Sequence, residues 1–149
     1  MTIKFVAATQ VPSATQVVAV PVGTDGAVPK ELSVSRKTLT AVGFEGKVGQ
    51  TYVVAGEKGT VTIAVGIGES GKVSTETLRK SAATLARAVA TFESVATTLA
   101  SVGRLDRKMA AQVVVEGITL AVHRYDALKT VDKVVPKLAT VTLVGPLGS

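Results

Sequence analysis

The chain has 149 residues, enough for one domain with a buried core. Hydrophobic residues make up 46% of it and charged residues 19%, which excludes intrinsic disorder. It has no cysteine, which excludes disulfides, thiolate nucleophiles and sulfur-ligated metals and fits a cytoplasmic protein. The uncharged run at residues 5–24 is interrupted by prolines, glutamines and a glycine, so we expect no membrane partner.

The net charge of +6 raises the question of an anionic partner. Basic residues are spread along the chain, and only 3% of residues are aromatic, so little is available to stack on unpaired bases. Single-strand binding is therefore disfavoured. Contact with the phosphates of duplex DNA is kept as an alternative.

The first part of the chain predicts two strands, at residues 3–7 and 16–22, followed by a break at residues 23–26. A short helix is predicted from Pro29 through Leu39, because proline is tolerated in a first helical turn.

A hairpin is predicted next, after the glycine-punctuated residues 43–49. Residues 50–55 and 60–65 are rich in β-branched side chains and flank a reverse turn at residues 56–59. We expect two antiparallel strands there, the second of them internal to the sheet.

A long amphipathic helix is predicted over residues 75–92, with Ser74 as its N-cap and Glu76 in its first turn. Apolar side chains recur at three- and four-residue spacings and define a core-facing side. They are Leu78, Ala82, Leu85, Val89 and Phe92.

Three glycines between that strand and that helix spell the dinucleotide fingerprint G-x-G-x-x-G, with Glu93 near the distance of a ribose-binding acid. In a true fingerprint the helix begins inside the motif, whereas here Lys72 and Val73 separate the last glycine from the N-cap. We interpret the glycines as a turn that needs positive φ. The candidate anion contacts are Gly66, Gly68, Gly71, Arg79 and Lys80.

The last part of the chain predicts a strand at residues 94–100, a second long helix from Asp106 to Tyr125 and a final strand at residues 138–144. Gly117, in the middle of this apolar helix, indicates that another backbone packs closely there. The order of elements predicts an α/β fold with a mixed sheet flanked by helices on both faces. The domain is assigned to residues 1–144, and residues 145–149 to a remnant of cloning or tag removal.

No constellation of side chains predicts catalysis. His123 is the single histidine, and no nucleophile elbow accompanies it. The aspartates are scattered among loops and helix ends, where each is better interpreted as a turn or cap residue.

Several segments, taken together, resemble the amino-terminal domain of the leucyl aminopeptidases, also called cytosol aminopeptidases. They are F-x-G-K-x-G-Q at residues 44–50, A-V-G-I-G at 64–68, L-R-K-S-A-A at 78–83, E-G-I-T-L at 116–120 and Y-D-A-L-K-T at 125–130. Each segment is a weak signal, but their order and spacing are more specific.

The resemblance implies a macro-domain-like α/β domain in front of a catalytic domain. In that family the catalytic domain holds two divalent metal ions, Mn, Zn or Mg, and the enzyme releases amino-terminal residues from peptides, leucine among them, usually as a hexamer. The implied partners are the chain's own catalytic domain, further copies and the peptide substrate. The catalytic motifs are absent here, so we expect the isolated domain to be inactive and to serve assembly and substrate access.

Two further hypotheses remain besides an amino-terminal aminopeptidase domain. The first is a DNA-binding module, which the basic charge suggests. The second is a nucleotide or ADP-ribose site, which the implied likeness to macro domains and the glycine-rich turn suggest. If a catalytic domain follows, as the resemblance implies, we expect it to pack against the second long helix and the segment after it. The candidates for this packing are Val113, Gly117, Leu120, Tyr125 and Lys129.

Overall fold

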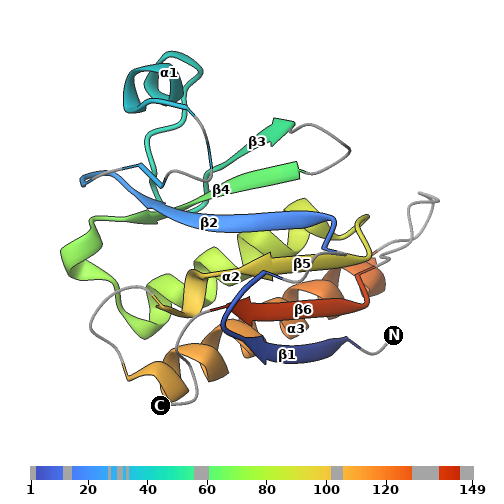
Figure 1. Ribbon diagram of the computed structural model, residues 1–149. Helices are drawn as coiled ribbons and strands as arrows, with labels where there is room; N and C mark the ends of the chain where they lie inside the picture. Colours follow the sequence, from blue (N-terminus) through green and yellow to red (C-terminus); the bar gives the residue numbers. More distant parts are fainter. Residues whose placement is uncertain are drawn as a thin grey trace.

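The protein is described by a computed structural model (Figure 1), which covers residues 3–11, 15–26, 28, 29, 32, 34–55, 61–101, 106–128 and 138–144. Six strands form one sheet in the order β1-β6-β5-β2-β4-β3. Every neighbouring pair is parallel except β3 and β4, which are antiparallel. The strands are β1 (Lys4–Ala8), β2 (Val17–Gly23), β3 (Thr51–Ala55), β4 (Val61–Gly68), β5 (Ser94–Thr97) and β6 (Thr140–Val144).

Helices cover both faces of this sheet. Two long ones lie side by side on one face, behind the strands in Figure 1, and a short one lies on the other face. The long helices are α2 (Thr75–Val89) and α3 (Arg107–Leu128), and the short one is α1 (Arg36–Ala41). Two single 3₁₀ turns, η3 (Ser70–Lys72) and η4 (Leu99–Ser101), follow β4 and β5. The predicted α/β class with a mixed sheet is confirmed.

The larger core lies between the sheet and the pair α2 and α3. Alternate residues of β2 and β4 point to this face because successive side chains of a strand point to opposite sides. Val17 and Ile63 are fully buried there, and so are Leu78 and Leu85 of α2. Ser81 is also buried, and its hydroxyl donates to the carbonyl oxygen of Gly66 at 2.9 Å, which ties α2 to β4.

A smaller core lies on the opposite face, beneath α1. Leu39 of α1 and Phe44 pack there against Val20 and Val22 of β2 and Ala64 of β4. This cluster covers the half of the sheet that contains β2, β4 and β3. In the described part of the chain, no helix combines the length and apolarity needed to cross a bilayer.

The predicted hairpin of β3 and β4 is confirmed, and so is the Ser74 cap, whose Oγ accepts from the Thr77 amide at 3.2 Å. The second long helix is also confirmed, with the Asp106 carboxylate accepting from the Met109 amide at 3.1 Å. The turn predicted at residues 56–59 lies outside the described residues.

Several predicted boundaries were wrong. The first helix begins at Arg36, not at Pro29, because the hydroxyl of the preceding Ser35 caps it by accepting from the Thr38 amide at 3.2 Å. The strand predicted over residues 94–100 ends at Thr97, whose hydroxyl accepts from the Leu99 amide and turns the backbone into η4. Strand β4 runs to Gly68 and not to residue 65, and α2 ends at Val89, before residue 92.

Candidate functional site at the carboxyl end of the sheet

Three loops converge at the carboxyl ends of the parallel strands β2 and β4, the edge at which open α/β sheets bind ligands. They are residues 23–26, 43–50 and 68–72. The Thr24 amide donates to the Gly68 carbonyl at 2.9 Å, and the Gly68 amide donates to the Gly46 carbonyl at 2.8 Å. These bonds fasten all three loops to one another.

Asp25 holds the turn after β4. Its carboxylate accepts from the Ser70 amide at 2.9 Å and from the Ser70 hydroxyl at 3.1 Å. These donors, the amide above all and then the hydroxyl, hold the pKa of Asp25 below its ordinary value, and the Arg36 charge acts in the same direction. The arrangement joins residues 45 positions apart in sequence.

Arg36 stabilises the same set of converging loops. Its guanidinium donates to the carbonyl oxygens of Gly23 and Gly26 at 2.8 Å each, and to that of Asp25 at 3.3 Å. The planar guanidinium carries several donors in a fixed geometry, which suits it to gathering the carbonyls of one turn. Arg36 therefore fixes the turn that positions Asp25.

Gln50 organises the loop at residues 43–50. Its side-chain oxygen accepts from the amides of Glu45 and Lys47 at 3.0 and 3.1 Å, while its side-chain nitrogen donates to the Gly43 carbonyl at 3.2 Å. Gly43, Gly46 and Gly49 all have positive φ, which the loop needs in order to wrap round one side chain. The F-x-G-K-x-G-Q segment is thus a structural loop.

The predicted glycine turn is only partly right. Gly68 has φ of +74°, but Gly66 lies inside β4 and Gly71 inside η3, and neither has positive φ. Gly66 is needed for space, since the Lys47 carbonyl occupies the place of a Cβ there. The amides of Gly66 and Gly68 donate to protein carbonyls, of Gln50 and Gly46.

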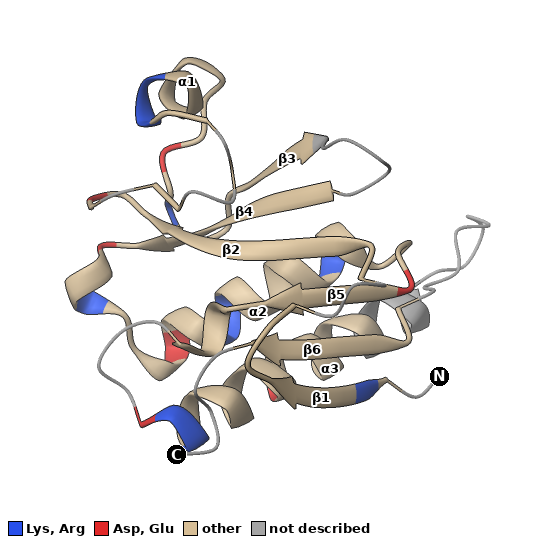
Figure 2. Ribbon diagram, in the orientation of Figure 1, with Lys and Arg blue, Asp and Glu red and all other residues tan. Residues whose placement is uncertain are grey.

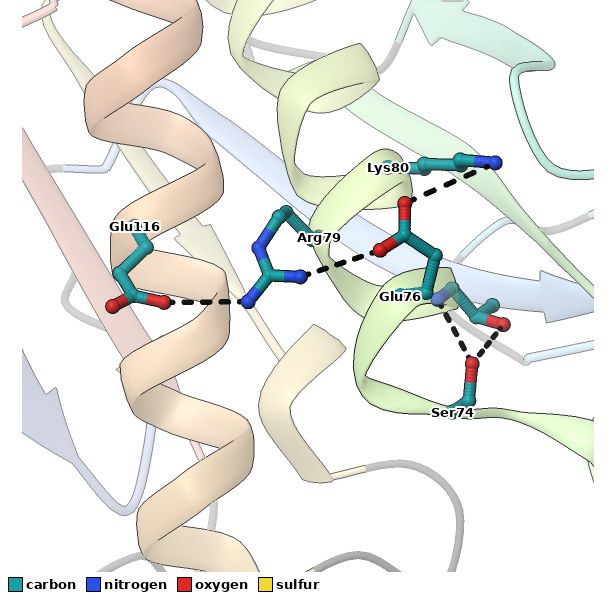
Figure 3. A network of polar contacts seen from close by, with 6 residues as sticks. Ser74, Glu76, Arg79, Lys80 and Glu116 are labelled. Carbon is teal, nitrogen blue, oxygen red and sulfur yellow. Dashed lines mark hydrogen bonds and ion pairs between the residues drawn. The ribbon is translucent and has the colours of Figure 1, made fainter.

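Arg79 and Lys80 belong to a network across the outer surface of α2 and α3 (Figure 3). Arg79 pairs with Glu76 of its own helix at 3.4 Å and with Glu116 of α3 at 3.6 Å. Lys80 pairs with Glu76 at 3.9 Å. Both basic side chains thus already have carboxylate partners. The predicted anion contact stays a prediction.

Two further ion pairs join residues close in sequence, Lys47 with Glu45 and Lys72 with Glu69. Figure 2 shows basic and acidic residues interspersed along the helices and loops. A duplex-binding surface normally carries a continuous basic patch. The described charges therefore do not favour the DNA-binding hypothesis.

The predicted interdomain residues divide into two groups. Val113 and Gly117 face into the domain, and Gly117 lies so close to α2 that a Cβ there would be 2.7 Å from the Arg79 carbonyl oxygen. Their packing partner is the domain itself, so this part of the prediction needs correction. Leu120 is 47% exposed and remains open to a partner. Tyr125 is in α3, and Lys129 lies outside the described residues.

Within the described residues, no group of three or more histidine, aspartate or glutamate side chains is placed to hold a metal ion. Buried side-chain nitrogen and oxygen atoms there all have hydrogen-bond partners. At the converging loops, the side chains of Asp25, Arg36 and Gln50 are all hydrogen-bonded to protein groups. Sequence reasoning missed Asp25 and Arg36 as organisers of these loops; the glycines around Asp25 marked a turn but not its distant partner.

Residues 8–132 match the family model described as "Cytosol aminopeptidase family, N-terminal domain". The chain belongs to this family. It is similar to the probable cytosol aminopeptidases of Corynebacterium diphtheriae (31% identical over 109 residues) and Corynebacterium glutamicum (35% over 107 residues). Each match covers 71% of this chain and 20% of the relative. The chain therefore spans about a fifth of these relatives' length.

Solved structures agree with this assignment. The bottromycin maturation enzyme BotP matches with a TM-score of 0.70 and 28% identity, over 90% of this chain and 28% of that one. A second structure of BotP, in complex with Mn, gives a TM-score of 0.67. A mutant of tomato leucine aminopeptidase matches with a TM-score of 0.70 over 99% of this chain and 33% of that one. Its 16% identity supports the fold alone. The predicted family is confirmed, and the likeness to macro domains stays a prediction.

Proposed function

We propose that this chain is the non-catalytic amino-terminal domain of a metal-dependent leucyl aminopeptidase. The observation that carries the proposal is the match of residues 8–132 to the amino-terminal domain of the family, within relatives about five times as long as the matched segment. The whole enzyme releases amino-terminal residues, leucine among them, from peptides in the cytoplasm, where the name of its relatives places them.

In this proposal the chemistry belongs to the part of the enzyme that follows the domain. Two divalent ions, Mn, Zn or Mg, would activate water and polarise the scissile carbonyl there. The Mn in one BotP structure supports a metal requirement in a related protein. The present domain serves assembly, in a hexamer, and access of the peptide to the catalytic domain.

The test begins with the mass of the native polypeptide, detected in its source cells with an antibody against this domain. We expect a chain several times as long as this one. The purified native protein should release leucine from a leucyl peptide, lose that activity with a chelator and regain it with Mn²⁺. A native polypeptide that ends near residue 144 would overturn the proposal, and so would a long polypeptide that releases no amino acid with any of the three metals.

A further inference from the structure

The outward side of α3 carries five exposed residues in one stripe: Met109, Gln112, Glu116, Thr119 and Leu120. Spacings of three, four, three and one place them together on a helix with 3.6 residues per turn. The opposite side of α3 is buried against α2 and the sheet. We call this set the α3 stripe.

Both ends of the α3 stripe are apolar. Met109 is 49% exposed and Leu120 is 47% exposed, and both are among the few large hydrophobic side chains with such exposure in the described residues. A single exposed apolar residue needs no explanation. Two on one side of one helix, about 16 Å apart at 1.5 Å per residue, define a surface that a partner segment could span.

The acidic residue in the middle of the α3 stripe has a basic partner. Glu116 pairs with Arg79 of α2 at 3.6 Å (Figure 3). This pair exists because Gly117 lets the two helices approach closely. A partner would therefore meet a surface with polar groups at its centre and no unpaired charge on Glu116.

The path of the chain brings the end of β6 close to the start of the α3 stripe. The Ser101 hydroxyl of η4 donates to the carbonyl of Val144, the last residue of β6, at 3.2 Å. η4 in turn packs against α3. Figure 1 shows the arrowhead of β6 and the first turn of α3 at the same end of the domain. Val144, the last residue of β6, therefore lies at the end of the domain at which α3 begins.

We infer that the α3 stripe is the docking surface for the part of the same polypeptide that follows β6. The inference rests on the proposed function, in which a catalytic domain follows. The docking segment would supply apolar side chains against Met109 and Leu120 and polar groups against Gln112, Glu116 and Thr119. Docking fixes the orientation of this domain relative to the rest of the enzyme.

Thiol labelling of the native full-length protein tests the inference, because this domain contains no cysteine of its own. Met109→Cys and Leu120→Cys report on the α3 stripe. Val42→Cys is the matched control, since Val42 is 52% exposed and lies at the end of α1, on the other face of the sheet. Peptide mass identifies the labelled cysteine. The rate of maleimide labelling at that cysteine is divided by the rate measured for the same variant unfolded in guanidinium chloride.

We expect the two stripe positions to react on the order of tenfold more slowly than the control, because a docked segment excludes the reagent. Equal rates at all three positions would overturn the inference. Slow labelling that becomes fast when dilution separates the subunits would also overturn it, because a second copy would then be the cover.

A charge substitution gives an independent measurement. Leu120→Arg in the full-length protein should lower the melting temperature of this domain, whereas Val42→Arg should leave it unchanged. If both substitutions leave it unchanged, the α3 stripe is not a docking surface. The mass of the native polypeptide separates the two levels of failure: a short native chain removes the proposed function, whereas a long one with a freely reactive Leu120→Cys removes the docking alone.

Discussion

The carbonyl oxygen of Lys47 occupies the place that a Cβ on Gly66 would take. The contact joins the 43–50 loop to the carboxyl-terminal part of β4. Two hydrogen bonds hold it, from the Gly66 amide to the Gln50 carbonyl at 2.9 Å and from the Gly68 amide to the Gly46 carbonyl at 2.8 Å. Gly66 is therefore fixed by the approach of a second backbone segment and not by its own dihedral angles.

Gly66→Ala should be among the most damaging single substitutions in the domain. The 43–50 loop would have to move, so we expect a loss of about 3 kcal/mol in the free energy of unfolding, at the upper end for overpacking. Gly71→Ala is the control, because no atom lies within 4 Å of a Cβ there and its φ is ordinary. Urea unfolding of both variants measures the difference. If the two variants unfolded alike, the loop would not press on β4 as described.

Gln50→Ala should loosen the same loop without a steric clash. It removes three hydrogen bonds from an exposed site, and we expect a loss of about 1–2 kcal/mol in the free energy of unfolding. Gln50→Glu keeps the acceptor for the amides of Glu45 and Lys47 but loses the donor to the Gly43 carbonyl. Its loss should therefore be smaller. A Gln50→Glu variant less stable than Gln50→Ala would contradict this assignment of the three bonds.

Gly117→Ala tests the close approach of α2 and α3. An ideal Cβ would lie 2.7 Å from the Arg79 carbonyl oxygen and 2.9 Å from the Ala82 Cβ. Alanine gains about 1 kcal/mol of helix propensity over glycine, whereas overpacking costs about 1–3 kcal/mol, so we expect a net loss. Gln112→Gly, at an exposed position of the same helix, measures the effect of helix propensity on stability where no overpacking is involved. Thermal unfolding would contradict the prediction if Gly117→Ala raised the melting temperature.

Local signals in the sequence were sufficient for the parts of the fold that depend on neighbouring residues. The periodicity of Leu78, Leu85 and Val89 and the Ser74 cap predicted α2, and the hairpin of β3 and β4 followed from its flanking turn signals. Gly117 predicted a close backbone because glycine is otherwise unfavourable in the middle of a helix.

The order of the strands and the junction at their carboxyl ends could not be predicted in the same way. They depend on contacts between residues distant in sequence, such as Asp25 with Ser70. The spacing of apolar residues along the chain does not indicate such a contact. Gly66 was assigned to a turn because its sequence neighbours suggest one, although the Lys47 carbonyl decides its role. Leu120 and Val113 looked alike in sequence, and only the packing of α3 separates the exposed side chain from the buried one.

Asp25 makes the stability of the domain depend on pH in a defined direction. The Ser70 amide and hydroxyl hold its pKa below the ordinary value of 3.8. A carboxylate with a lowered pKa in the folded state adds stability that is fully present above the unfolded value and is lost as pH falls through the folded one. Asp25→Asn removes this contribution. The free energy of unfolding of the wild type should exceed that of Asp25→Asn by a constant amount from about pH 7 to about pH 5, and the difference should shrink below about pH 4. Urea unfolding across this range measures it, with Ser70→Ala as the background in which the pH-dependent part should become smaller but persist, because the hydroxyl is lost and the backbone amide still donates to the carboxylate. A difference that stayed constant to about pH 2, or one that grew on acidification, would show that Ser70 does not hold the charged form of Asp25.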